Sequence, residues 1–126
     1  MSEEVEKLIA KASDALEAAQ QLLKTGFFPD AASKAYYSMF YAARALLVSE
    51  GIDVTKHSAV ESAVGFYFAK SGKLDSKYHR MLIEARNVRE IADYDIDEEV
   101  SESEAAAKLE DGKAFLKAVN AILKKS

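Results

Sequence analysis

Apolar residues recur at three- and four-residue steps through most of this chain, the spacing that places them on one face of an α-helix. The first run predicts a helix over residues 3–24, with a stripe formed by Val5, Leu8, Ile9, Ala12, Leu16, Ala19, Leu22 and Leu23. Thr25-Gly26 follows this run. We expect the helix to end there, because glycine readily adopts the left-handed conformation of a helix C-terminus.

The second run predicts a helix over residues 29–50 that is apolar on nearly every side. Within residues 35–48 the only plainly polar side chains are Ser38 and Arg44. A helix of this kind is either central in its domain or covered by a second subunit. We therefore predict a homodimer built partly from this helix. Aromatic side chains at such spacing can also stack on bases, but core or interface is their commoner role; the predicted interface residues are Tyr37, Phe40 and Tyr41.

Three further helices are predicted over residues 57–71, 76–92 and 101–124. Ser101 and Glu104 have the spacing of a capping box at the start of the last one. Gly112 lies in its apolar stripe and allows close approach of a neighbouring helix. Helices joined by short connections form bundles, so we expect residues 1–126 to be a single all-α domain, a mostly antiparallel bundle of four to five helices.

The composition narrows the function classes. The 126 residues include no cysteine, which excludes disulfides, thiolate metal sites and a cysteine nucleophile. The net charge is −4, so a nucleic-acid site would have to be local. There is no apolar run long enough to span a membrane and no signal-peptide core at the N-terminus, so we expect a cytoplasmic protein without membrane contact.

Arg44 is the first candidate for chemistry, because it is a charged residue on the most apolar helix. A buried guanidinium needs a carboxylate or several carbonyl acceptors. Arg44 is therefore either half of a structural ion pair or a charge that faces a cleft or an interface.

A second group of candidates lies near the end of the fourth predicted helix. Arg86, Arg89 and Asp93 follow each other at three- and four-residue steps, so they can share one helical edge, with Asn87 and Tyr94 beside them. At this spacing Arg89 and Asp93 can simply stabilise the helix as a pair. Alternatively, two guanidinium groups on one edge suit the oxygens of a phosphate.

Metal ligation has weak support in the sequence. His57 and His79 stand alone without matched carboxylates, and each is expected at a helix end or on the surface. Asp93, Asp95, Asp97 and Glu104 have calcium-loop spacing, but Glu98 occupies the position that requires glycine. We predict no metal, no cofactor and a solvated acidic loop.

Several sequence blocks together resemble the HEPN domain family, and more narrowly its small stand-alone prokaryotic members. The resemblance covers roughly residues 5 to 124, and its blocks are Ala35-Tyr-Tyr-Ser-Met-Phe-Tyr-Ala-Ala-Arg44-Ala-Leu-Leu, Gly51-Ile-Asp, Lys56-His57, Gly72-Lys-Leu and Arg89-Glu-Ile-Ala-Asp93-Tyr94. It implies a four- or five-helix bundle that is commonly a homodimer. It also implies pairing with a small nucleotidyltransferase, as in toxin–antitoxin systems.

Many members of the family are metal-independent ribonucleases, and this chain departs from their motif. The motif is an arginine, then a polar residue, then a histidine that is separated from the arginine by a gap of four to six residues. Arg86-Asn87 matches its start, but Ile91, Ala92 and Asp93 occupy the histidine positions. An imidazole is the usual proton carrier near neutral pH. The sequence thus assigns no catalytic residue and leans away from an enzyme.

The function predicted from the sequence is a non-catalytic, dimeric HEPN-like module. It would pair with a nucleotidyltransferase-type partner and bind RNA or a nucleotide. The candidate binding residues are Arg44, His57, Arg86, Asn87, Arg89, Asp93 and Tyr94. The alternative is a divergent metal-independent ribonuclease that uses His57 or Tyr94 in place of the missing histidine.

Overall fold

The computed structural model describes residues 1–96 and 99–125, and every regular element in these ranges is helical. The all-α prediction is therefore confirmed. The elements are α1 (Glu3–Lys24), α2 (Phe28–Ser49), α3 (His57–Val64), the π-helical turn η1 (Gly65–Ala69), α4 (Ser76–Tyr94) and α5 (Glu102–Lys124).

The helix ends lie close to the predicted ones, because local signals set them. Gly26 follows α1 with φ of 86° and Gly51 follows α2 with φ of 77°, the left-handed conformation that glycine tolerates. Ser101 and Glu104 form the expected capping box at the start of α5. The largest differences from the prediction are that the third helix becomes π-helical at Gly65 and ends at Ala69, and that α4 continues through Tyr94.

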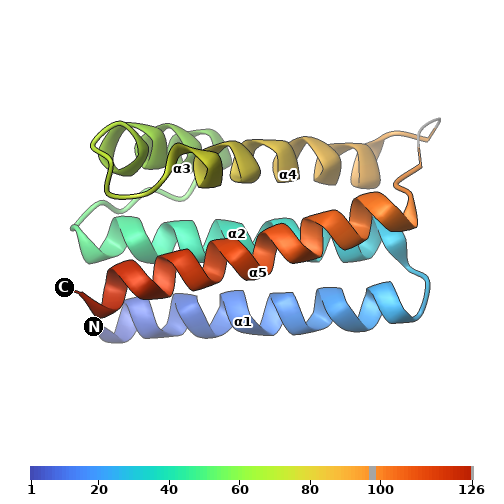
Figure 1. The fold of residues 1–126 in the computed structure, drawn as a ribbon, viewed down its shortest axis with the longest axis horizontal. Helices are drawn as coiled ribbons and strands as arrows, with labels where there is room; N and C mark the ends of the chain where they lie inside the picture. The colour runs from blue at the N-terminus through green and yellow to red at the C-terminus, as the bar shows by residue number, and fades with distance from the viewer. Residues whose placement is uncertain (97–98, 126) are drawn as a thin grey trace.

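The long helices lie side by side as a bundle, with α2 in its centre (Figure 1). In Figure 1, α1 lies below α2, α4 continues from α3 along the upper side, and α5 crosses in front. Both chain termini lie at the same end of the bundle. Among the described residues, no helix has the length and apolarity that a membrane crossing requires.

The apolar surface of α2 is covered within the chain itself. Its contacts extend to α1, α3, α4 and α5, and its buried residues include small alanines that let the neighbours approach. The fully buried hydroxyl of Ser38 on this helix donates a hydrogen bond of 2.7 Å to the carbonyl oxygen of Ala12 in α1. The all-round apolar pattern thus follows from the central place of α2, and it gives no separate reason for a second subunit.

Candidate functional site

The aromatic residues of α2 meet the first residue of α3. The Tyr36 hydroxyl is hydrogen-bonded to Nδ1 of His57. The imidazole also lies against Phe40, with ring centroids 4.5 Å apart, and near Tyr37 at 6.1 Å. His57 is therefore a half-buried member of an aromatic cluster rather than an isolated histidine at a helix end.

The protonation of this pair follows from its surroundings. Burial, followed by the charges of Arg89 and Arg86, lowers the pKa of His57 below its ordinary value of 6.5. Burial and the carboxylate of Glu61 raise the pKa of Tyr36 above its ordinary value of 10. Near neutral pH, the hydrogen bond therefore joins an uncharged phenol to an uncharged imidazole.

Arg89 of α4 lies over the same aromatic face. Its Nη2 donates a 2.8 Å hydrogen bond to the Tyr37 hydroxyl, and its Nε lies 3.0 Å from a carboxylate oxygen of Asp93. The guanidinium carbon is 5.3 Å from the ring centre of Tyr37, 6.0 Å from Tyr36 and 5.7 Å from Tyr94. These distances are typical of cation–π contacts.

Neighbouring groups stabilise the protonated form of Arg89. Burial alone would lower the pKa of Arg89, but the charges of Tyr37 and Asp93 outweigh it and raise the pKa overall. The guanidinium stays protonated. It can stabilise an anion, but it cannot exchange protons near neutral pH.

Arg86, one turn earlier on α4, is held by two carboxylates. Its Nε lies 2.5 Å from Oε2 of Glu61 in α3, and its Nη1 lies 3.3 Å from Glu90. The side chain of Glu61 is only 10% exposed. Burial raises the pKa of this carboxyl group and Arg86 opposes the shift, so the ion pair is what keeps a charge at this buried position.

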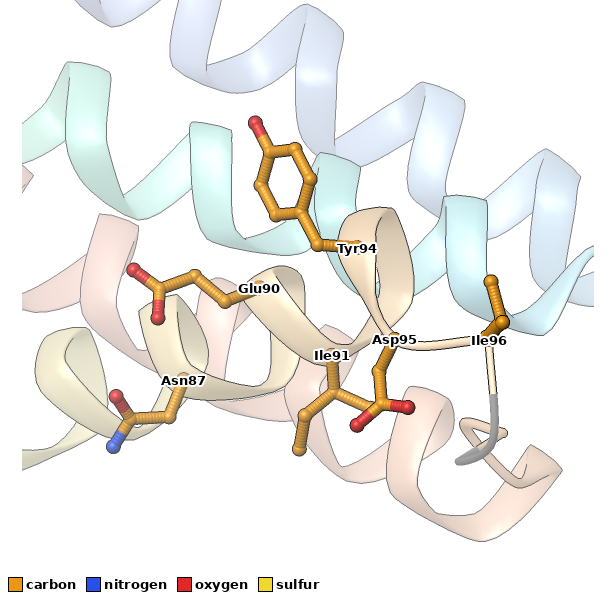
Figure 2. Close-up of a pocket in the computed structure, with 6 residues that line it drawn as sticks. All are labelled: Asn87, Glu90, Ile91, Tyr94, Asp95 and Ile96. Atoms are coloured by element: carbon orange, nitrogen blue, oxygen red, sulfur yellow. The ribbon is translucent and has the colours of Figure 1, made fainter.

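An open groove of about 520 Å³ runs along the C-terminal end of α4, and six residues line it: Asn87, Glu90, Ile91, Tyr94, Asp95 and Ile96. Figure 2 shows that Tyr94 and Ile91 project from the last turns of α4 in different directions, and that Glu90 precedes them on the same helix. Tyr94 is 73% exposed, although Arg89 lies over its ring. Tyr94 therefore links the buried cluster to the open surface.

The structure brings most of the predicted site residues together. His57, Arg89, Asp93 and Tyr94 are connected through the contacts with Tyr36 and Tyr37 above. Arg86 lies one turn earlier on α4 and acts on His57 through its charge, and Asn87 lies on the adjoining groove. The Arg89–Asp93 pair has the predicted helical spacing.

Arg44 has a different setting. It lies further along α2, where its Nη2 is 3.9 Å from Asp53, a residue whose side chain is 75% exposed. Its Nε is buried and makes no hydrogen bond among the described residues. Arg44 is thus a largely buried guanidinium with a distant, solvated partner.

The three predicted interface residues also have contacts inside the chain. Phe40 is buried, with 7% of its surface exposed. Tyr37 accepts the hydrogen bond from Arg89, and the ring of Tyr41 lies 5.4 Å from the Lys11 ammonium. Only Tyr37 and Tyr41, which are half-buried, retain surface for a partner.

Two residues of the site were missed by sequence reasoning. The aromatic spacing of residues 36–41 indicates core or interface and does not mark Tyr36 as the partner of His57, and the sequence motifs do not include Glu61. A lone carboxylate within the apolar run of residues 59–64 is the one signal in the sequence that would have marked Glu61 as needing a buried cation.

The described residues contain no group of three or more His, Cys, Asp and Glu side chains that could hold a metal ion. Asp97 and Glu98, which belong to the calcium-like spacing, lie outside the described residues. The site as described consists of arginines, carboxylates, tyrosines and one imidazole.

Comparison with known proteins establishes the family. The sequence profile of the HEPN domain matches residues 5–122, nearly the whole chain. This chain belongs to the HEPN domain family, as the sequence blocks around Arg44 and Asp93 predicted.

Individual relatives are similar over most of their length. "Putative toxin MJ0142" of Methanocaldococcus jannaschii is 42% identical over 113 residues, which cover 90% of this chain and 77% of that protein. "Putative toxin MJ0605" of the same organism is 33% identical, covering 97% of this chain and 90% of that protein. A UPF0332 protein of Archaeoglobus fulgidus is 33% identical, and the match covers 97% of this chain and 98% of that protein.

Proposed function

We propose that this chain is a toxin-type HEPN module that binds RNA or a nucleotide at the C-terminal edge of α4. In this proposal it acts as a homodimer together with a nucleotidyltransferase-type partner. Its membership of the HEPN family and the two relatives named as putative toxins support the class. The binding activity, the dimer and the partner are the parts that experiment has to test.

The observation that carries the binding proposal is the stack of Arg89 on Tyr94 beside the open groove. An exposed aromatic ring can stack on a base, and such stacking is worth about 1–3 kcal/mol per base. The guanidinium beneath it offers a charged fork to a phosphate. A base on Tyr94 and a phosphate on Arg89 are therefore both within reach of one nucleotide.

Binding would exchange one anion for another. Asp93 now contacts Arg89, and Glu90 contacts Arg86. Both carboxylates would have to release their arginines as a phosphate arrives, and Glu90 and Asp95 in the groove repel a polyanion. We therefore expect weak, salt-sensitive binding of short single strands or mononucleotides rather than of duplexes.

Fluorescence anisotropy with a labelled single-stranded RNA tests this site. We expect Tyr94→Ala to weaken binding about tenfold, the lower end of the stacking contribution. Tyr67→Ala is the matched control, because Tyr67 is also exposed, at 46%, but lies on η1. An equal loss in both variants, or no binding by the wild type at low salt, would contradict the proposal.

The partner is tested by the neighbouring gene. If it encodes a nucleotidyltransferase, we expect the two purified proteins to form a complex of defined stoichiometry in size-exclusion chromatography with light scattering. Separate elution of the two proteins at tens of micromolar would remove this part of the proposal.

A divergent ribonuclease is the second candidate, and the position of His57 favours it. The structure brings an imidazole from α3 to the aromatic cluster that holds Arg89, although α4 has none at the motif positions. Its lowered pKa makes it a neutral base near pH 7.

We nevertheless expect no metal-independent cleavage of mixed-sequence RNA by the purified protein. Nδ1 of His57 is engaged by Tyr36, and its ring is packed on Phe40, so the imidazole is held as part of the core. Cleavage that disappears in His57→Gln, in a variant that still melts cooperatively, would establish the nuclease instead. Cleavage unaffected by His57→Gln and by Arg86→Ala would indicate a contaminant.

A further inference from the structure

A second groove, distant in the sequence from the α4 site, runs between α1 and α5. It has a volume of about 500 Å³ and an apolar floor made by Leu16 of α1 with Leu116 and Ala121 of α5. At one end the two helices touch, since Leu16 packs against Gly112. Figure 1 shows α1 and α5 continuing together from there toward the chain termini.

The α5 edge of this groove carries only cationic and amide side chains. Lys113, Lys117 and Lys124 line it together with Asn120, and the lining residues among those described include no carboxylate. These positions follow one stripe of α5, which spans roughly 16 Å between the first and last lysine at 1.5 Å per residue. A local basic stripe is notable on a chain whose net charge is −4.

The lysines are largely available to a partner. Lys113 pairs with Glu110 on its own helix, at 3.0 Å, and both side chains are exposed. Lys117 and Lys124 form no ion pair with any described residue. An exposed pair such as Lys113–Glu110 contributes little free energy, so a carboxylate from outside can compete for the ammonium.

We propose that the α1/α5 groove docks an acidic amphipathic helix of a partner protein. Leucine-type side chains of that helix would cover the floor formed by Leu16 and Leu116, and its carboxylates would pair with the lysines on the rim. Helix-in-groove binding uses apolar anchors at three- and four-residue steps, which a groove between two helices can accept.

The apolar floor favours protein over nucleic acid. A phosphate backbone would satisfy Lys113, Lys117 and Lys124, but it would leave the leucine side chains of the floor uncovered. The described residues that line the groove include no aromatic ring on which a base could stack. Charge complementarity therefore points to an anion that also carries apolar side chains.

The probe is a fluorescein-labelled synthetic peptide of about 15 residues, long enough to form a helix on binding. Leucines at three- and four-residue steps form one face, and glutamates beside them match the lysine stripe. The same peptide with glutamine in place of glutamate is the control. We expect binding by the full chain that weakens as salt is raised, and clearly weaker binding of the glutamine peptide.

Variants of the chain locate the binding. The double variant Lys113→Glu and Lys117→Glu should weaken binding about tenfold, as expected for the loss of two surface ion pairs. Lys70→Glu with Lys77→Glu makes the same change of net charge elsewhere and should leave binding unchanged. Ala121→Gln fills the floor of the groove with a good helix former, and we expect it to weaken binding without loss of fold.

Four results would overturn the proposal. The first is that the peptide does not bind, and the second is that it binds the groove variants as well as the wild type. The third is that binding of a single-stranded RNA, and not of the peptide, depends on Lys113 and Lys117. The fourth is that sedimentation shows self-association of the chain that depends on these lysines. Because Tyr94 lies on α4, RNA binding that requires Tyr94 should survive every groove variant, so this inference and the proposed function can fail separately.

Discussion

The buried carboxylate of Glu61 forms an ion pair with Arg86, so the charge state of Glu61 matters for stability. The folded protein binds the Glu61 proton more tightly than the unfolded chain, because burial raises the pKa above its ordinary value of 4.5. The contribution of Glu61 to the free energy of unfolding is therefore most favourable below about pH 4.5, and it is lost as the pH rises through the raised pKa. The ion pair with Arg86 limits that loss of stability.

We predict that Arg86→Ala destabilises the protein by about 1–3 kcal/mol near pH 7, because it leaves a buried carboxylate without a partner. The loss should shrink at about pH 5, where Glu61 takes up a proton more readily. Denaturant unfolding at the two pH values measures this. Arg80→Ala is the control, since Arg80 is exposed and its side chain hydrogen-bonds to Ser76 on its own helix. An equal loss at both pH values would contradict the prediction.

His57 has the opposite pH dependence. Its pKa is lowered in the fold, so its stabilising contribution is present above about pH 6.5 and is lost as the pH falls through the lowered pKa. We expect the difference in unfolding free energy between wild type and His57→Gln to shrink as the pH is lowered. NMR titration of the imidazole should give a pKa below 6.5; a pKa at or above that value would show that the ring is solvated.

For Arg44, the exposure of its ion-pair partner determines how much unfolding free energy a substitution removes. Its ion-pair partner among the described residues, Asp53, is 3.9 Å away and mostly exposed. When the guanidinium is removed, Asp53 is hydrated by water and no buried charge remains. We predict that Arg44→Met, which keeps the apolar stem, changes the unfolding free energy by less than about 1 kcal/mol. A loss above about 3 kcal/mol would point to a buried partner.

At the scale of elements, the π-helical turn η1 depends on a glycine. A Cβ built on Gly65 would lie 2.8 Å from Cε1 of His79, and the His79 ring is itself fixed by a 2.9 Å hydrogen bond between its Nε2 and the carbonyl oxygen of Glu61. The packing of η1 on α4 thus requires that position 65 have no side chain.

We predict that Gly65→Ala destabilises the protein by roughly 1–3 kcal/mol despite the better helix propensity of alanine. Gly112→Ala is the matched control, because the tightest contact of its Cβ would be the flexible end of Leu16 at 3.0 Å, and the carbonyl oxygen of Ala35 at 3.7 Å is at ordinary van der Waals distance. Thermal melting should show a small change for Gly112→Ala. In a double-mutant cycle, His79→Ala should relieve most of the cost of Gly65→Ala; additive effects would refute the proposed clash.

At the scale of the whole molecule, the predicted homodimer has to use surface that the bundle leaves open. Phe40 is buried inside its own chain, whereas Tyr41 is half-buried and contacts Lys11 of α1. The central position of α2 therefore divides the predicted interface residues into core and surface.

We expect light scattering at tens of micromolar to give the mass of a dimer. Phe40→Ala should lower the unfolding free energy by about 3 kcal/mol through the cavity it leaves, with no change in the mass of the folded species. Tyr41→Ser should weaken the dimer and cost less stability. A monomeric wild type would remove the dimer from the proposed function.

The sequence by itself determined the helices and the family. Three- and four-residue periodicity, the glycines after α1 and α2, and the Ser101–Glu104 capping box are local features, because each depends on residues within a few turns of one helix. The pairing of Arg89 with Asp93 is also a local feature, because both residues lie one turn apart on one helix. The HEPN resemblance depended on blocks such as Ala92-Asp93-Tyr94, which can be recognised before any contact between helices is known.

Only the tertiary structure decided which helix faces meet and what lies between them. Tyr36 and His57 are 21 residues apart, and Arg89 reaches Tyr37 across 52 residues. Periodicity shows that a face is apolar, but not which neighbour covers it, so α2 was compatible with a second subunit until four helices of the same chain were found around it. A buried charge such as Glu61 likewise acquires its role only when packing removes water from it and places Arg86 within reach.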